Sequence, residues 1–155
     1  KRDYDYVLID CPAGIEQGYK NAVAGADKAI VVTTPELSAV RDADRIIGLL
    51  EQEDVEPPKL VVNRIRGHMM KSGEMLDVDE IVSILAIELL GIVVDDENVI
   101  KHSNKGEPVA LHPNSKASIA YRNIARRILG ETVPLMSLED EKGMFTKVKK
   151  FFGIR

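Results

Sequence analysis

The amino-acid sequence predicts an α/β fold in which helices flank a mostly parallel sheet. Four short apolar runs have the continuous hydrophobicity of strands buried on both faces, namely residues 6–9, 28–33, 59–64 and 89–94. Amphipathic segments with helical spacing separate these runs, and such alternation is typical of parallel βαβ units. With 155 residues, 45% of them hydrophobic, the chain is long enough for one sizeable core.

Composition excludes several classes of protein. No stretch reaches the roughly 18 apolar residues of a transmembrane helix, and no signal peptide opens the chain, so we expect a cytoplasmic protein. The single cysteine, Cys11, excludes internal disulfides, and two subunits would supply two thiolates where an iron–sulfur cluster needs about four. The net charge is −4, and because residues 142–155 hold five basic residues and no acid, the preceding 141 residues carry −9. This acidic body argues against binding of nucleic acid.

The first two helices are expected between the first three apolar runs. One covers residues 17–26. The next begins at Thr34, which can act as an N-cap, and Pro35, which suits a first helical position. Its buried stripe is predicted to comprise Leu37, Val40, Ile47 and Leu50.

Further helices are expected in the second half of the chain. Asp77 and Glu80 have the spacing of a capping box at the start of a helix, whereas residues 65–76 are predicted to be a loop. Residues 98–106 predict a short helix. A last helix is expected to follow the N-cap Ser115 and to end before Gly130. Its predicted inner stripe comprises Ala117, Tyr121, Ile124 and Ile128.

Asp10 is a candidate magnesium ligand. It follows the apolar run 6–9, and in open parallel sheets ligands gather beyond the carboxyl ends of the strands. In nucleoside-triphosphate switches a carboxylate at a strand end holds the metal, often through water, and a turn containing glycine follows the γ-phosphate. Pro12 and Gly14 suit such a turn. The alternative is that Asp10 caps the next helix and Pro12 shapes its first turn.

The segment from Asp10 to Gly14 resembles the Asp-x-Pro-Ala-Gly segment of the deviant Walker A ATPases, the ParA/MinD family. The resemblance extends over nearly the whole chain but corresponds to the later half of such proteins. It implies a P-loop NTPase-like fold, with ATP and Mg²⁺ as cofactors. It further implies that Asp10 is catalytic and contacts Mg²⁺ through water, and that the switch comprises Asp10, Pro12, Ala13 and Gly14.

The phosphate-binding P-loop is missing from the sequence. No Gly-x-x-x-x-Gly-Lys-Ser/Thr occurs, and in the family this loop lies upstream of the matching segment. We therefore expect that this chain is the later portion of an ATPase and that it is inactive by itself.

A nucleotide-base site is expected after the third and fourth apolar runs. The side-chain amide of Asn63 offers a donor and an acceptor that match the edge of adenine. The resemblance implies that Asn63 and Arg64 border the purine and that Val94, Asp95 and Asp96 supply backbone contacts, although relatives often have proline where this chain has Val94. Alternatively, Asn63 simply ends a strand.

The exposed side of the helix after Pro35 is a candidate partner surface. It carries Ser38, Arg41, Asp42 and Arg45. Such a face is usually only solvated and salt-bridged. The resemblance implies that it receives an activator or topological partner and a septation-inhibitor protein, with Ser38 and Asp42 as the clearest matches.

The C-terminal segment has the pattern of a membrane-binding helix. We expect an ATPase domain over residues 1–130, a linker over 131–138 and an amphipathic helix over 139–155. On a helical projection, one arc of about 120° holds Met144, Phe145, Val148, Phe151 and Phe152, whereas Lys147, Lys149 and Lys150 lie outside it. A basic amphipathic helix of this kind lies in the interface of an anionic membrane. The alternative is a terminal helix that docks on its own domain or on a partner.

The function implied by the resemblance is a peripheral membrane ATPase that positions the cell-division septum. It would cycle between an ATP-bound homodimer on the inner face of the cell membrane and an ADP-bound soluble monomer. One alternative is a non-catalytic, membrane-tethered interaction module. Another is a ParA-type partitioning ATPase, although that class binds DNA through basic surfaces and this body is acidic.

The histidines predict no zinc site. His68, His102 and His112 lack i, i+4 spacing and have no cluster of acids or thiols near them in the sequence. We expect ordinary surface or loop residues at these three positions.

Overall fold

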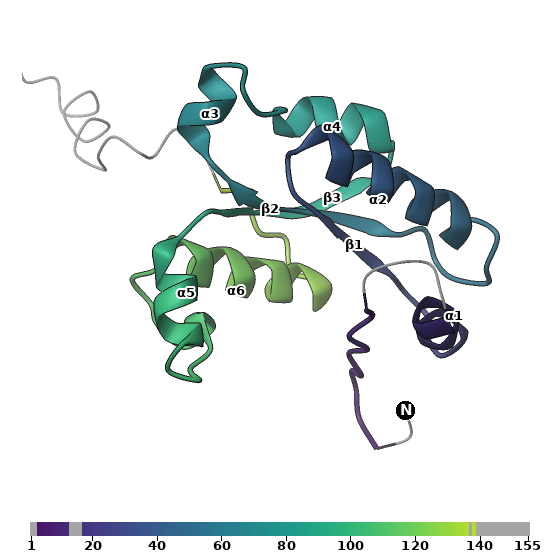
Figure 1. Cartoon of the computed structure of the whole chain (residues 1–155). Coiled ribbons are helices and arrows are strands. Elements are labelled where there is room, and N and C mark those ends of the chain that lie inside the picture. Colours follow the sequence, from purple (N-terminus) through teal and green to yellow (C-terminus); the bar gives the residue numbers. More distant parts are fainter. Residues whose placement is uncertain (1–2, 13–16, 137, 139–155) are drawn as a thin grey trace, which may run out of the picture. The chain divides into compact units, whose positions relative to one another are not determined.

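The computed structural model describes residues 3–12, 17–136 and 138 (Figure 1). It divides into two compact units. The first unit comprises Lys1–Asn63 and Leu76–Leu90, and the second comprises Arg64–Met75 and Gly91–Arg155.

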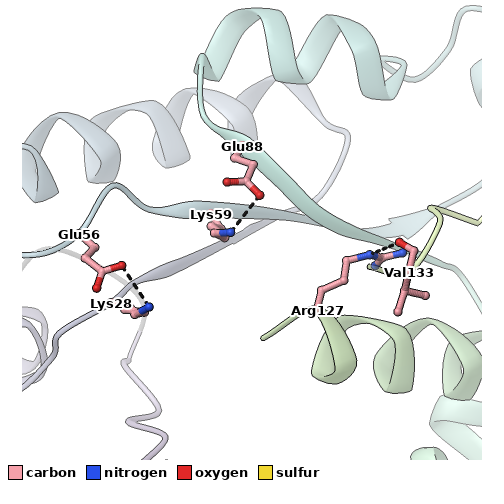
Figure 2. Close-up of polar contacts among 6 residues, drawn as sticks. All are labelled: Lys28, Glu56, Lys59, Glu88, Arg127 and Val133. Carbon is pink, nitrogen blue, oxygen red and sulfur yellow. Dashed lines mark hydrogen bonds and ion pairs between the residues drawn. The ribbon is translucent and has the colours of Figure 1, made fainter. Parts of the chain in front are cut away.

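Among the described residues, three strands form a parallel sheet that helices flank, which confirms the predicted fold class. β1 (Ile30–Thr33), β2 (Lys59–Ile65) and β3 (Glu88–Val94) lie in the order β1-β2-β3. In the register of β1 on β2, Ile30 is opposite Lys59. An ion pair of 2.9 Å joins Lys59 to Glu88, the first residues of β2 and β3 (Figure 2).

The apolar run at residues 6–9 does not form the predicted buried strand. Residues 6–12 have no regular secondary structure, and Leu8 is 86% exposed. A strand in a parallel sheet needs a neighbour that completes its backbone hydrogen bonds. In the described part of the chain the sheet consists of β1, β2 and β3, and none of these strands pairs with the run. The expectation that Asp10 ends a strand is therefore wrong for this structure.

In the first unit, α2 (Leu37–Leu50) packs against β1 and against α4 (Val78–Leu85), and α1 (Gln17–Ala24) precedes β1. The capping box of α4 is confirmed, because the side chain of Asp77 accepts from the Glu80 amide at 2.7 Å and the Glu80 side chain accepts from the Asp77 amide at 2.9 Å. These bonds satisfy two of the amides that a helix start leaves unpaired.

The start of α2 differs from the prediction. Glu36, not Thr34, is the N-cap, and Pro35 lies just before it, fully buried. Leu37, the first residue of α2, is 50% exposed. The buried stripe of α2 instead comprises Val40, Ala43, Ile47 and Leu50.

In the second unit, α5 (Glu97–Ser103) leads through the 3-10 turn η1 (Val109–Leu111) to α6 (Lys116–Ile128), and η1 contacts both helices (Figure 1). The unit also contains α3 (Gly67–Lys71), which lies in the predicted loop. α3 and η1 were missed because elements of one or two turns are too short for a helical period.

The inner stripe of α6 is only partly as predicted. Ala117 and Ile124 are buried, but Tyr121 is half-buried and Ile128 is 37% exposed. Small residues take their place, since Ser118 and Ala120 are also buried.

Gly91 on β3 explains how closely α6 approaches. A Cβ atom at this position would collide with Cγ1 of Ile124, so only glycine admits that side chain without a shift. The helix therefore packs on a position of the strand that has no side chain.

The segment after α6 is held against that helix by Arg127. The Arg127 guanidinium donates to the carbonyl of Val133 at 2.9 Å (Figure 2) and to the carbonyl of Pro134 at 2.6 Å. The predicted linker, residues 131–138, is thus fixed by hydrogen bonds over its first half. The predicted membrane helix 139–155 lies outside the described residues. In the part that is described, none of the helices has the length and apolar content needed to cross a bilayer.

Candidate nucleotide site

The carboxyl end of β2 has an unusual backbone. Asn63 is half-buried in the strand, and Arg64, the next residue, is exposed and has a φ of 58°. A positive φ is unfavourable for a residue with a side chain and costs on the order of 1 kcal/mol or more. Of the two residues predicted to border a purine, Arg64 thus has a backbone conformation that is unfavourable for a residue with a side chain.

Hydrogen bonds join the ends of β2 and β3. The amide of Asp95 donates to the carbonyl of Ile65 at 2.8 Å, and Nε of Arg66 lies 2.6 Å from Oδ2 of Asp95. Arg66 is a residue of this site that the sequence analysis missed. The available signal was the repeat Arg64-Ile65-Arg66, which places a second guanidinium two residues beyond the first.

Asp96 has a structural role that the sequence did not predict. Its Oδ1 accepts from the amide and side chain of Asn98 at 2.9 and 2.8 Å, which caps α5. Its Oδ2 accepts from the Ser115 hydroxyl at 2.7 Å and from the amide of Ala117 at 3.2 Å, at the start of α6. One carboxylate therefore holds the N-termini of two helices. Only the backbone of Asp96 is left for contact with a base.

These contacts shift the pKa of Asp96. Burial by itself would raise the pKa, but the hydrogen bonds from Ser115, Asn98 and Ala117 together lower it to about 2. The positive ends of two helix dipoles act in the same direction. Asp96 is thus ionised at neutral pH. Val94, the last residue of β3, is half-buried.

Two residues of the predicted switch lie in the exposed segment before α1. Asp10 and Pro12 are exposed and lie outside helices and strands, and Ala13 and Gly14 fall outside the described residues. A single accessible carboxylate fits the water-mediated contact expected for Mg²⁺, because this ion usually keeps several waters and takes one or two protein carboxylates. The catalytic role of Asp10 stays a prediction.

The predicted partner surface is accessible. Ser38, Arg41, Asp42 and Arg45 are all exposed, and they lie in the first nine residues of α2, opposite its buried stripe. Their role in binding stays a prediction. The predicted membrane residues lie outside the described residues, and their role also stays a prediction: Met144, Phe145, Val148, Phe151, Phe152, Lys147, Lys149 and Lys150.

The histidines depart from the sequence prediction. His102 and His112 both contact the carboxylate of Glu107, with ring nitrogens 3.2 and 3.4 Å from Oε2. The hydrogen bond from His102 lowers the pKa of Glu107. Sequence spacing missed this cluster because a turn, not a helical repeat, brings the residues together. His68 is an exposed residue of α3, as expected.

Comparison with known proteins places the chain in a family. Residues 2–129 match the ParA family profile, which is described as NUBPL iron-transfer P-loop NTPase. The chain is 73% identical over 157 aligned residues to the septum site-determining protein MinD of Bacillus subtilis, and the match covers all of this chain and 59% of that protein. It thus spans less than two thirds of the length of this relative.

Two solved structures have the same fold. The first is the MinC:MinD cell division protein complex of Aquifex aeolicus, with a TM-score of 0.84 and 48% identity over 88% of this chain and 56% of the other. The second is the septum site-determining protein MinD of Pyrococcus horikoshii complexed with Mg-ADP, with a TM-score of 0.74 and 25% identity over 83% and 51% of the two chains. With its parallel sheet and the profile match over residues 2–129, the chain belongs to the ParA/MinD family of P-loop NTPases.

Proposed function

We propose that this chain is the later portion of a septum-positioning ATPase that binds Mg-ATP and cycles between membrane and cytoplasm. The observation that carries the proposal is the 73% identity to a septum site-determining protein over the whole chain. The relative solved with Mg-ADP supports nucleotide and Mg²⁺ as ligands of the longer protein. The P-loop would come from sequence that this chain lacks.

The base of the nucleotide would lie against the ends of β2 and β3. The amide of Asn63 would read the adenine edge, because it pairs a donor with an acceptor. The hydrogen bond from the Asp95 amide to Ile65 and the ion pair of the Asp95 carboxylate with Arg66 would keep the backbone of residues 94–96 in place, so that its polar groups meet a base without rearrangement. Arg64, held at a positive φ, would border the same base.

Asp10 would act as the sensor of the triphosphate. Its carboxylate is accessible, and we propose that it contacts Mg²⁺ through water. When bound, Mg²⁺ neutralises the charge that develops on the phosphate oxygens. The movement of residues 10–14 would follow the presence of the γ-phosphate and change the surface used for dimerisation.

The membrane step would depend on residues 144–152. Burial of a large apolar side chain yields roughly 1.5–3 kcal/mol and each lysine near an anionic leaflet about 1 kcal/mol, so one helix binds reversibly. Two helices in an ATP-bound homodimer would raise the affinity by about 10²–10⁴ through the effective concentration of the second. Nucleotide would in this way control residence on the membrane.

The exposed residues of α2 would receive protein partners. The relative solved as a MinC:MinD complex supports a septation inhibitor as one of them. Ser38, Arg41, Asp42 and Arg45 form a mixed-charge surface, which favours specificity through charge complementarity.

The decisive experiment uses the full-length protein. ATP turnover and sedimentation with anionic vesicles are measured with ATP, with ADP and without nucleotide. We expect Asp10→Asn to lower turnover by at least about tenfold, whereas Asp5→Asn, which changes an exposed acid in the same segment, leaves it unchanged. Equal vesicle binding in all three nucleotide states would disprove the proposed cycle.

A second set of variants tests the two surfaces. Phe151→Glu should abolish sedimentation with vesicles, whereas Ile154→Glu, which lies off the apolar stripe, should have a much smaller effect. On α2, Asp42→Lys should weaken binding of the septation inhibitor and Asp44→Lys should not. If both members of either pair behave alike, the corresponding surface is wrongly assigned.

A further inference from the structure

We propose that His102, Glu107 and His112 form a binding site for a divalent transition-metal ion of the zinc class, separate from the nucleotide site. Their ligand atoms all lie within 4.8 Å of one another. Two imidazoles and one carboxylate are donors that Zn²⁺ prefers, whereas Mg²⁺ and Ca²⁺ prefer oxygen ligands. The Glu107 carboxylate contributes a negative charge that attracts a cation.

The spacing of the donors is close to that of a tetrahedral site. Bonds of about 2.0–2.1 Å to zinc place neighbouring ligand atoms about 3.3 Å apart. The observed distances from Oε2 of Glu107 are 3.2 Å to Nδ1 of His102 and 3.4 Å to Nε2 of His112. Two of the three edges of the ligand triangle therefore already have the required length.

The backbone fixes two of these ligands. At the end of α5, the amide of Gly106 donates to the carbonyl of Ser103 and the amide of Glu107 donates to the carbonyl of His102, both at 3.0 Å. This pair of bonds is a Schellman motif, and it requires the left-handed φ of 71° that Gly106 adopts. The turn returns the chain over the last turn of α5, so Glu107 lies beside His102.

The third ligand comes from the end of η1. The amide of His112 donates to the carbonyl of Val109 at 2.9 Å, which holds His112 near the carboxylate. The rings of His102 and His112 are stacked, with centroids 3.3 Å apart and planes at 19°. Coordination of one ion by both rings therefore requires rotation about side-chain bonds but no movement of the backbone.

The surroundings leave room for a fourth ligand. The side chain of His102 is 16% exposed, whereas those of His112 and Glu107 are more open, so one side of the cluster faces solvent and a water molecule can complete the tetrahedron. Lys105 lies near Glu107 and opposes a cation electrostatically. We therefore expect binding weaker than that of a closed structural zinc site.

The test measures binding of the metal alone to the untagged protein. Cys11→Ser serves as the background, because the exposed Cys11 thiol would itself bind zinc. Zn²⁺ affinity is measured by competition with a chromophoric chelator, and Co²⁺ reports geometry through its visible absorption. We expect one ion per chain, with the absorption of tetrahedral Co²⁺ bound by nitrogen and oxygen.

Variants identify the ligands. Glu107→Gln keeps the shape of the side chain and His112→Ala removes one ring, and each should lower Zn²⁺ affinity by at least about tenfold. His68→Ala, at an exposed histidine of α3, should leave affinity unchanged. Zn²⁺ should also raise the melting temperature of the background protein but not that of Glu107→Gln. Absence of saturable binding, or binding that survives both substitutions, would overturn the proposal.

Discussion

Arg66 and Asp95, which follow two neighbouring strands, form an ion pair with 2.6 Å between Nε and Oδ2. The same aspartate donates its amide to Ile65, so side chain and backbone both connect the ends of β2 and β3. The pair is partly open to solvent, so we expect it to fix the positions of the two strand ends more than to stabilise the fold.

Substitution of Arg66 separates the effect of this ion pair on stability from its effect on nucleotide binding. Exposed ion pairs contribute about 0.2–1 kcal/mol, so Arg66→Gln should lower the free energy of unfolding of the chain by no more than that. Nucleotide affinity of the full-length protein should fall more than stability predicts, because residues 94–96 lose their support. Arg126→Gln, which breaks the similar pair with Glu131, is the matched control and should change only stability. Equal nucleotide affinity in both variants would contradict the proposed position of the base.

The low pKa of Asp96 predicts a loss of stability in acid. The pKa is about 2 in the folded state and 3.8 in the unfolded state. The group therefore contributes stability that is fully present above pH 3.8 and is lost as the pH falls towards 2. The shift corresponds to roughly 2 kcal/mol.

The measurement is urea unfolding between pH 6 and pH 2. Asp96→Asn should remove most of this contribution at pH 6 and flatten the dependence on pH in this window. Asp54→Asn, at an exposed acid after α2, should leave the slope as in the parent chain. A slope that is the same with and without the Asp96 carboxylate would show that its hydrogen bonds do not stabilise the fold.

The contact of Gly91 with Ile124 predicts that a methyl group added at position 91 will destabilise the chain. Gly91→Ala should destabilise the chain by about 1–3 kcal/mol, because α6 must move away from β3. Adding Ile124→Ala should remove the collision, so the two substitutions together should cost less than the sum of their separate effects. Gly48→Ala is the control, since it lies within α2 with nothing near its Cβ position and should stabilise by about 0.5–1 kcal/mol.

The positive φ of Arg64 predicts that one substitution will raise stability and weaken nucleotide binding. Arg64→Gly should raise the stability of the chain by up to about 1 kcal/mol, since glycine adopts a positive φ without penalty. The same change should weaken nucleotide binding by the full-length protein, because the guanidinium is lost and the turn is no longer restrained. Arg64→Ala, which removes the guanidinium but keeps the strain, distinguishes the two contributions. If binding is unchanged in both variants, Arg64 does not border the base.

Local signals in the sequence predicted those parts of the fold that depend on local interactions. The capping box at Asp77 and Glu80 and the N-cap at Ser115 were correct because their partners lie three residues away. The run at residues 6–9 was wrong because a strand depends on a neighbour and not only on its own apolar side chains. Tyr121 and Ile128 were assigned to the core because no local rule shows that α6 buries Ser118 and Ala120 and places Ile124 against Gly91.

The candidate sites show the same division. Asn63 and Asp95 were predicted as base contacts because parallel strands bring their carboxyl ends together, which is a general property of such sheets, and their role stays a prediction. Asp96 was predicted to contribute through its backbone. Its carboxylate instead joins the starts of two helices, through a hydrogen bond with Ser115, which lies 19 residues further along the chain. The histidine cluster depends on the left-handed turn at Gly106, whose direction in space is not encoded in residue spacing.

The exposed side chains of β1 affect how this polypeptide behaves when it is produced alone. β1 lies at one edge of the described sheet, and Val32 on this strand is 60% exposed. An open apolar edge is a template for association between chains. Concentrated samples should therefore aggregate, and light scattering should rise with protein concentration. A charged gatekeeper such as Val32→Lys should keep the polypeptide dispersed.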